Sequence, residues 1–302
     1  MKYNVHDGQI DMIIDRHLDG KKPDDFLKEY LVPDKTANRY LRSGRFLINS
    51  LPCRDLSAPL KTDDMLTVVF EPEGIDWAPA PEEASVVYED AFVYIVHKPA
   101  GIIIHSDKDA ADCLNAMAAR YQISRGIHAP VRPLHRLDRE TEGLVIYSKI
   151  PFFQPWLDRQ LKEKRIRRSY YALCRGKCTA GKSFTVNAPI GKDRHRNGVY
   201  RISKTGKQAV TECTCLFSEN GYSLFRCVLQ TGRTHQIRVH LSSHGFPIVN
   251  DPIYGVRDRL IRQMGLWAYE IVYTSPVSGK KHKIKAPLKF AEQFPENWHI
   301  LI

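Results

Sequence analysis

One segment without hydrophobic periodicity constrains the fold of this 302-residue chain more than any other feature. It spans Glu71–Ala84, with the sequence EPEGIDWAPAPEEA, in which proline, glycine and acidic residues predominate. Such a composition is typical of a linker, and a chain of this length can hold two domains. We therefore predict a small domain at 1–75, a linker at 76–84 and a larger domain at 85–302.

The pattern before this segment predicts a helix followed by short strands. The helix is expected at 36–44, starting at Thr36 and stopped by Gly44, with strands at 45–48 and 66–70. Arg39 and Arg42 then share one helix face, and Arg45 lies just beyond its end. These arginines are candidates for binding a polyanion, although a solvated charged face is the alternative.

The pattern after the segment is rich in strands. Strands are expected at 86–88 and 91–97, and helices at 110–121, 153–164 and 234–244. Pro151 and Pro155 predict a kink where the second of these helices begins. Short strands with few helices indicate an α+β domain.

Charge points to a polyanionic partner, because the net charge is +11 and each phosphate neutralised by Lys or Arg releases counterions. Between 158 and 207 there are fifteen Lys or Arg residues against three acids. Aromatic residues are interleaved with them in Lys162–Gly176, which suits RNA backbones and stacked bases. Arg165 and Arg168 are the RNA-binding candidates here.

Hydropathy gives no indication of a membrane. The first fifteen residues lack the apolar core of a signal peptide, and no run of about 18 apolar residues occurs. We expect a cytoplasmic protein without a membrane partner. Nothing resembles a coiled coil or dimer helix, so a monomer is expected.

Seven cysteines, an odd number scattered along the chain, favour reduced thiols over a disulfide framework. Cys174, Cys178, Cys213 and Cys215 would be the members of a zinc site. Their spacing does not fit a zinc knuckle, and Cys213 and Cys215 fall on one strand face, where they would pack as small apolar side chains.

The most informative motif for function is His135–Leu144, with the sequence HRLDRETEGL. It places Asp138 between Arg136 and Arg139 and follows it with a turn-forming Gly143. Nearby positive charge favours the ionised form of a carboxylate. An isolated motif of this kind would be a set of exposed ion pairs, but flanking strand-like segments indicate a loop on a rigid scaffold, where catalytic groups are common.

A second motif, QTGRTHQIRVHLSSHG at 230–245, predicts a strand that turns into a helix capped by Thr234. Arg233 would project from that corner. His240 and His244 lie four residues apart, the spacing of two metal ligands, but no glutamate is placed as in HExxH. We expect no metal, and we expect His235 to bond locally or to contact phosphate.

These motifs, with RSYYALCRG at 168–176 and DPIYG at 251–255, resemble the RluA family of RNA pseudouridine synthases over 86–287. The KPAG loop at 98–101 also fits the family. Residues 23–71 resemble the S-four type of RNA-binding module, without its usual Arg-Leu-Asp start. The resemblance implies a small α/β RNA-binding domain before a synthase domain whose mixed, mainly antiparallel sheet is flanked by helices.

The resemblance also implies an isomerisation without a cofactor, in which uracil leaves its ribose, rotates and rejoins through C5. Asp138 matches the family's catalytic aspartate, and Arg233 matches its ion-pair partner. Arg136 matches the arginine that fills the space left by the extruded uridine, and Tyr170 matches the tyrosine against the flipped base. The tyrosine hydroxyl is a candidate relay for the C5 proton. Ile237 is expected in an apolar wall, and His235 and Arg238 among the RNA contacts.

One departure from the family stands in the catalytic loop, where Glu142 replaces the usual serine and is expected to alter hydrogen bonding or repel phosphate. The predicted substrate is large-subunit ribosomal RNA, with transfer RNA as the alternative. Two other functions stay open at this point: a non-catalytic RNA-binding or ribosome-assembly protein of the same fold, and a metal-dependent RNA hydrolase that uses the histidines.

Overall fold

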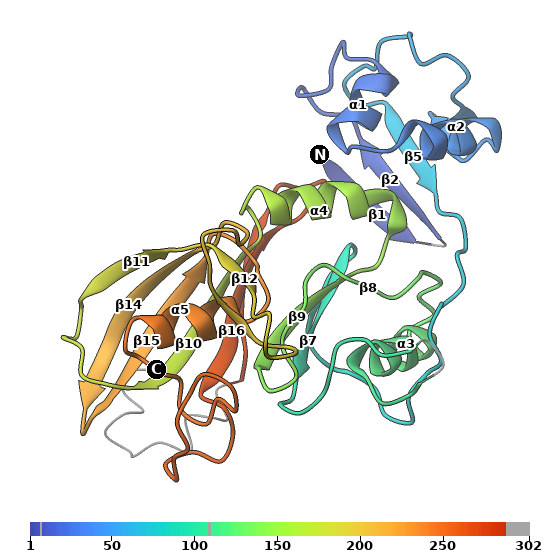
Figure 1. The fold of residues 1–302 in the computed structure, drawn as a ribbon. Helices are drawn as coiled ribbons and strands as arrows, with labels where there is room; N and C mark the ends of the chain where they lie inside the picture. The colour runs from blue at the N-terminus through green and yellow to red at the C-terminus, as the bar shows by residue number, and fades with distance from the viewer. Residues whose placement is uncertain (7, 108–109, 288–302) are drawn as a thin grey trace.

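The computed structural model describes residues 1–6, 8–107 and 110–287. The end of the domain predicted at 85–302 therefore lies outside the described residues. Two sheets, one of five strands and one of ten, carry most of the described structure (Figure 1). The larger sheet is mixed and mainly antiparallel, and few helices accompany it, which confirms the α+β prediction.

The N-terminal unit is built on the five-stranded antiparallel sheet, in the order β1-β2-β5-β3-β4. Its elements are β1 (Lys2–His6), β2 (Gln9–Ile13), α1 (Pro23–Glu29), α2 (Asp34–Arg42), β3 (Phe46–Ile48), β4 (Leu51–Pro52) and β5 (Met65–Val69). The polar first residues gave no prediction for β1 and β2. Only alternate β2 residues, Ile10 and Met12, enter the core, so the strand needs little apolar sequence.

Helix α2 begins two residues earlier than the sequence suggested. Pro33, in an extended conformation, precedes the helix, and Asp34 lies in its first turn, where a negative charge is favourable. The prediction of Thr36 as the helix start is therefore wrong. Arg39 and Arg42 lie in the last turn, as expected from their spacing.

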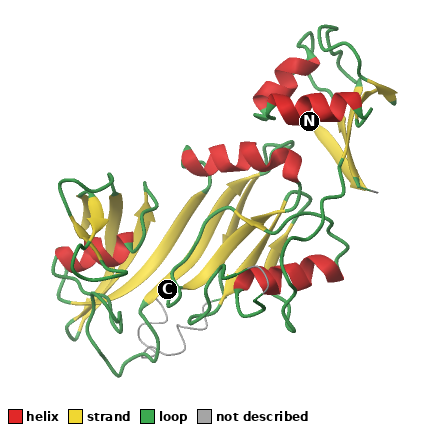
Figure 2. Ribbon diagram, turned by 45° about the vertical axis from the view of Figure 1, so that its right-hand side comes forward, coloured by secondary structure: helices red, strands yellow, loops and turns green. Residues whose placement is uncertain are grey.

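The large domain contains the ten-stranded sheet, in the order β11-β14-β15-β10-β16-β9-β7-β6, with β17 beside β16 and β8 beside β9. Its strands are β6 (Ser85–Glu89), β7 (Val93–Lys98), β8 (Arg132–Pro133), β9 (Glu142–Ser148), β10 (Arg167–Arg175), β11 (Ser183–Asn187), β14 (Val210–Glu219), β15 (Tyr222–Leu229), β16 (Leu266–Thr274) and β17 (Lys281–Lys285). A separate hairpin pairs β12 (Ile190–Lys192) with β13 (Tyr200–Ile202). Figure 2 shows the strands continuing side by side through both halves of this domain.

The two halves of the large sheet meet where β9 runs parallel to β16, through the pairs Glu142 with Trp267 and Gly143 with Ala268. Gly143 has φ +128°, and a Cβ there would lie 2.2 Å from the carbonyl oxygen of Ala268. Only glycine fits this approach. Gly143 thus serves a strand junction and not the predicted turn, and the loop that carries Asp138 enters the sheet directly at this seam.

In the described part of the large domain, the helices are α3 (Leu114–Ser124), the short 3-10 helix η1 (Pro151–Phe153), α4 (Gln154–Lys162) and α5 (Gln236–Ser243). Pro151 and Pro155 occupy the first turns of η1 and α4, where a missing N–H costs nothing, so they start these helices instead of kinking one. Thr234 does not cap α5. His235 precedes that helix with φ 56°, in the left-handed region.

Residues 76–84, predicted as a linker, contain no helix or strand but lie against α3. The Ala80 N–H donates to the Ala116 carbonyl at 2.9 Å, and Arg120 Nε donates to the Ala80 carbonyl at 2.8 Å. The N-terminal unit also packs on the large domain, because Tyr30 contacts Phe153 edge to face at 5.2 Å. Residues of the two parts belong to one buried apolar cluster.

Candidate active site

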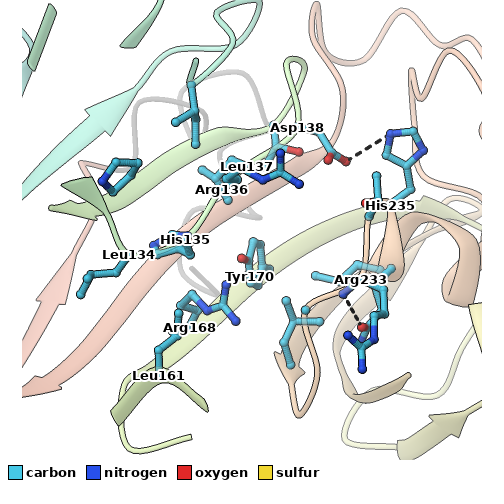
Figure 3. A pocket seen from close by; sticks show the side chains of 18 of the residues that line it. Leu134, His135, Arg136, Leu137, Asp138, Leu161, Arg168, Tyr170, Arg233 and His235 are labelled. Atoms are coloured by element: carbon cyan, nitrogen blue, oxygen red, sulfur yellow. Dashed lines mark hydrogen bonds and ion pairs between the residues drawn. The ribbon is translucent and has the colours of Figure 1, made fainter. Parts of the chain in front are cut away.

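The predicted catalytic loop opens into a cavity of about 730 Å³ at the seam of the large sheet. Its walls come from the loop 133–138, the end of α4, β10 and the corner that leads into α5 (Figure 3). Predicted site residues from distant parts of the sequence meet here, namely Arg136, Asp138, Arg168, Tyr170, Arg233, His235, Ile237 and Arg238. Figure 3 shows Asp138 and His235 facing each other in this cavity.

Asp138 is held by a buried arginine. Arg238 Nη1 donates to Asp138 Oδ2 at 3.0 Å, and the same guanidinium binds Asp251 through Nε at 2.7 Å and Nη2 at 2.8 Å. Arg238 is only 1 % exposed and Asp251 is buried, whereas 24 % of the Asp138 side chain is exposed. The bidentate pair therefore fixes the arginine, and the arginine presents an accessible carboxylate.

Asp251 comes from the DPIYG segment and is the residue whose role the sequence did not reveal. Besides Arg238, it accepts backbone N–H bonds from Ile253 at 2.9 Å and Tyr254 at 3.1 Å. Burial alone would raise the pKa of Asp251, but these donors lower it below its usual value. The segment can fold this tightly because Gly255 has no Cβ. A Cβ at this position would lie 2.0 Å from the Ile248 carbonyl oxygen.

The structure corrects two assignments made from the sequence. The ion-pair partner of Asp138 is Arg238, not Arg233, whose Nε donates to the Gln208 carbonyl at 2.9 Å. All three guanidinium nitrogens of buried Arg238 donate to carboxylates. The prediction that Arg238 contacts RNA is therefore wrong. The two arginines lie five residues apart, and spacing alone does not tell which of them enters the core.

Lys98 fixes the backbone of the loop that carries Asp138 through hydrogen bonds. This buried residue of the KPAG loop donates from Nζ to the carbonyls of Pro99, Ile102 and Arg139 at 2.7 to 2.9 Å. The Gly101 N–H also donates to Arg139 at 2.8 Å, and the Thr141 N–H donates to the Asp138 carbonyl at 3.2 Å. Burial lowers the pKa of Lys98 to about 8. The loop is thus held by its backbone and not only by its charged side chains.

Tyr170 lines the cavity from β10, next to a β-bulge between Ser169 and Tyr170. Bulges commonly re-aim a side chain beside an active site. Tyr170 and Ile237 belong to one apolar cluster, as expected for a wall of the site. Burial raises the pKa of Tyr170, so the phenol stays neutral at pH 7.

Cations gather on the other side of the cavity. Lys164, Arg168 and Arg233 all line it, and burial together with the two arginines lowers the pKa of Lys164. Mutual repulsion of this kind is relieved by an anion such as phosphate.

Arg136 is exposed at the cavity, with Nη1 3.4 Å from His105 Nε2, and Arg165 is exposed outside it near Glu163.

Glu142 does not face the cavity, so the predicted repulsion of phosphate does not arise. Its carboxylate binds His97 Nε2 at 3.0 Å and accepts a hydrogen bond from Gln263. Burial would raise the pKa of Glu142, but these partners lower it. Glu142 therefore takes part in hydrogen bonds beside the loop that carries Asp138, and the predicted change of hydrogen bonding relative to a serine stays a prediction.

The arginines predicted to bind RNA in the N-terminal unit lie apart from the cavity. Arg39 Nε binds Glu71 Oε2 at 2.8 Å, and Arg45 Nη1 donates to the Phe70 carbonyl at 2.9 Å. Arg42 is exposed at the end of α2. Arg39 and Arg45 therefore have partners within the protein, whereas Arg42 is exposed at the helix end.

Three of the candidate metal ligands, His240, Cys213 and Cys215, are buried in the core. His240 is buried between Thr211 Oγ1 at 2.9 Å and the Ala188 carbonyl at 3.0 Å. Cys213 and Cys215 are buried in the core, with Cys213 Sγ 3.7 Å from Cys227 Sγ. No group of three or more metal-binding side chains occurs in the part of the chain that the structure describes.

Comparison with known proteins decides the family, because the model of the RNA pseudouridylate synthase family matches residues 92–243. This chain belongs to that family of enzymes. The matched residues include the loop 133–138, β10 and α5, so they contain both Asp138 and its arginine partner. The resemblance to RluA-type synthases found in the sequence is confirmed.

Relatives of this pseudouridine synthase cover most of its length. The uncharacterized RNA pseudouridine synthase YhcT of Bacillus subtilis is 36% identical over 231 residues, covering 75% of this chain and 76% of the relative. The ribosomal large subunit pseudouridine synthase D of Neisseria meningitidis serogroup B is 31% identical over 303 residues, covering 93% of this chain and 79% of the relative. The enzyme therefore acts on RNA and isomerises uridine.

The fold is shared with solved structures of more distant proteins. Human RNA pseudouridylate synthase domain containing 1 superposes with a TM-score of 0.55 at 24% identity, covering 68% of this chain and 84% of that one. None of the helices in the described part of the synthase combines the length and apolar character that a membrane span requires.

Proposed function

We propose that this synthase isomerises uridines in large-subunit ribosomal RNA and that Asp138 is the reacting carboxylate. The observation that carries the proposal is the Asp138–Arg238–Asp251 chain, which holds one accessible carboxylate in the wall of a cavity that cations also line. Such a carboxylate is suited to act as nucleophile or base on an extruded nucleotide. A non-catalytic RNA-binding protein of this fold would have no need to keep that geometry.

The surrounding side chains support distinct roles in the reaction. The neutral ring of Tyr170 fits stacking against uracil, and its raised pKa disfavours the proton-accepting part of the predicted relay. Lys164, Arg168 and Arg233 fit the flanking phosphates. Arg136 is exposed where a side chain would replace the extruded uridine.

The N-terminal unit, residues 1–75, is proposed to add RNA affinity as an S-four-like module. Its packing against Phe153 keeps it at a fixed place relative to the cavity. Relatives named for the large ribosomal subunit align over 93% of this chain, which includes most of this unit, and this supports ribosomal over transfer RNA. No specific observation favours transfer RNA.

The test compares pseudouridine maps of total RNA from two strains. In one, the only copy of the gene encodes the wild-type protein, and in the other it encodes Asp138→Asn. Carbodiimide-dependent reverse-transcription stops that vanish in the variant at uridines of large-subunit ribosomal RNA are the expected result. Stops that vanish in transfer RNA would overturn the substrate, and identical maps in the two strains would overturn the role of Asp138.

A further inference from the structure

His235 lies beside the proposed reacting group and has no role in the function argued so far. Its Nε2 atom is 3.9 Å from Asp138 Oδ2, the same oxygen that Arg238 binds (Figure 3). On its other side, Nδ1 is 2.9 Å from the hydroxyl of Tyr254. The ring thus stands between a phenol and a carboxylate.

A chain of hydrogen bonds determines which ring nitrogen carries the proton. The Tyr200 N–H donates to the Tyr254 hydroxyl oxygen at 2.7 Å, so that oxygen already accepts one bond. The phenol then donates its own proton to His235 Nδ1. The opposite tautomer would make the phenol accept twice and would direct the Nε2 lone pair at the Asp138 carboxylate, which is repulsive.

The charge state agrees with this arrangement. Burial lowers the pKa of His235, with Arg238 acting in the same direction and Asp138 opposing it. The ring is therefore neutral at pH 7 with one proton to present. The backbone of His235 also supports the placement, because its left-handed φ of 56° turns the ring from the start of α5 toward the cavity.

We propose that His235 is a positioning residue, held as the neutral Nε2–H tautomer by Tyr254, that presents its proton toward Asp138 Oδ2. This rests on the proposed role of Asp138. Together, Arg238 and His235 constrain one carboxylate oxygen, while no hydrogen bond to Oδ1 occurs within the described residues, so Oδ1 is the oxygen that this arrangement leaves for the substrate. His235 is then not the phosphate contact that the sequence suggested.

The tautomer is tested directly in the free enzyme by nitrogen-15 spectra of the histidine rings at pH 7. The His235 signals are assigned as those missing in His235→Gln. A pyridine-type Nδ1 and a pyrrole-type Nε2 are expected in the wild type, with mixed tautomers in Tyr254→Phe. The reverse assignment in the wild type, or an unchanged ring in Tyr254→Phe, would overturn the proposal whether or not the RNA substrate has been identified.

The kinetic test uses an unmodified transcript of large-subunit ribosomal RNA, tritiated at C5 of uridine, and follows tritium release. His235→Ala should lower kcat about 10- to 100-fold with little change in KM. Glutamine supplies a donor near the Nε2 position, so His235→Gln should recover kcat to within about fivefold of the wild type. His235→Lys should not recover it.

A phosphate contact would give the opposite pattern. Rescue by His235→Lys, or a rise in KM that grows with salt at constant kcat, would overturn the positioning role. Tyr254→Phe should lower kcat in the wild-type background but not in His235→Gln, whose donor does not depend on the phenol. If the wild type releases no tritium, the ribosomal substrate fails, while the ring spectra still decide the tautomer.

Discussion

The seam of the large sheet and the N-terminal unit use arginine in opposite ways. At the seam, Arg238 is 1 % exposed and bound to two carboxylates, whereas in the N-terminal unit Arg39 is 51% exposed and bound to one. A buried guanidinium needs every partner, because any unpaired charge stays desolvated. An exposed one is solvated and screened by salt. Charges at the seam are therefore interdependent, and those of the N-terminal unit act nearly independently.

The largest effect is expected from removing the buried partner of Arg238. Asp251→Ala leaves that guanidinium hydrogen-bonded only to the partly exposed Asp138, with Glu140 Oε2 3.9 Å from Nη1, which should lower the free energy of unfolding by about 3 to 5 kcal/mol. Urea unfolding measures this loss. Glu71→Ala, which removes the partner of Arg39, is the matched control and should change stability little. Equal effects of the two substitutions would break the contrast between the regions.

The second effect concerns the strand junction beside the catalytic loop. Gly143→Ala combines backbone strain with overlap against the Ala268 carbonyl, and should cost about 2 to 5 kcal/mol. Gly8→Ala, in the N-terminal unit, has φ +73° and no atom within 4 Å of the added Cβ, so it isolates the strain alone. Thermal unfolding of both variants measures the difference. Similar losses would contradict the close approach at the seam.

The third effect is a dependence of stability on pH that comes from Lys98. Its folded-state pKa of about 8 lies below the ordinary lysine value of 10.5, so the folded protein loses this proton first as pH rises. The free energy of unfolding of the wild type, relative to that of Lys98→Met, should then rise between about pH 8 and 10, by up to about 1.4 kcal/mol per pH unit. Urea unfolding across this range measures the slope.

Lys2→Met, at an exposed position of β1, is the control for Lys98 and should leave the slope of the wild type unchanged. A slope that Lys98→Met retains in full would show that the buried lysine is not its source.

The smallest effect is expected from the N-terminal unit. Arg42→Ala should raise KM about threefold, leave kcat unchanged and reduce the salt dependence of RNA binding by about one unit of slope. Filter binding at several salt concentrations measures it. Lys28→Ala, on α1 and paired with Asp24, is the matched control. A fall in kcat for Arg42→Ala would assign this unit a part in the chemistry.

The sequence was sufficient to predict the fold class, the strand content around the site and the family, because motifs such as HRLDRETEGL occur whole in single segments. It did not predict β1 and β2, whose buried faces rest on a few alternate residues such as Ile10 and Met12. It also did not distinguish Arg233 from Arg238. Which arginine enters the core depends on the left-handed turn at His235 and on Asp251, and both are properties of the folded chain.

The most direct test of the central claim is single-turnover tritium release from the C5-labelled ribosomal RNA transcript by the wild type and by Asp138→Asn. The account predicts that the variant keeps the fold and the RNA affinity of the wild type, because an amide oxygen can still accept the Arg238 hydrogen bond and Asp251 still neutralises the guanidinium, and that it loses at least about 10³-fold in rate. Release by Asp138→Asn at a rate near that of the wild type would contradict it.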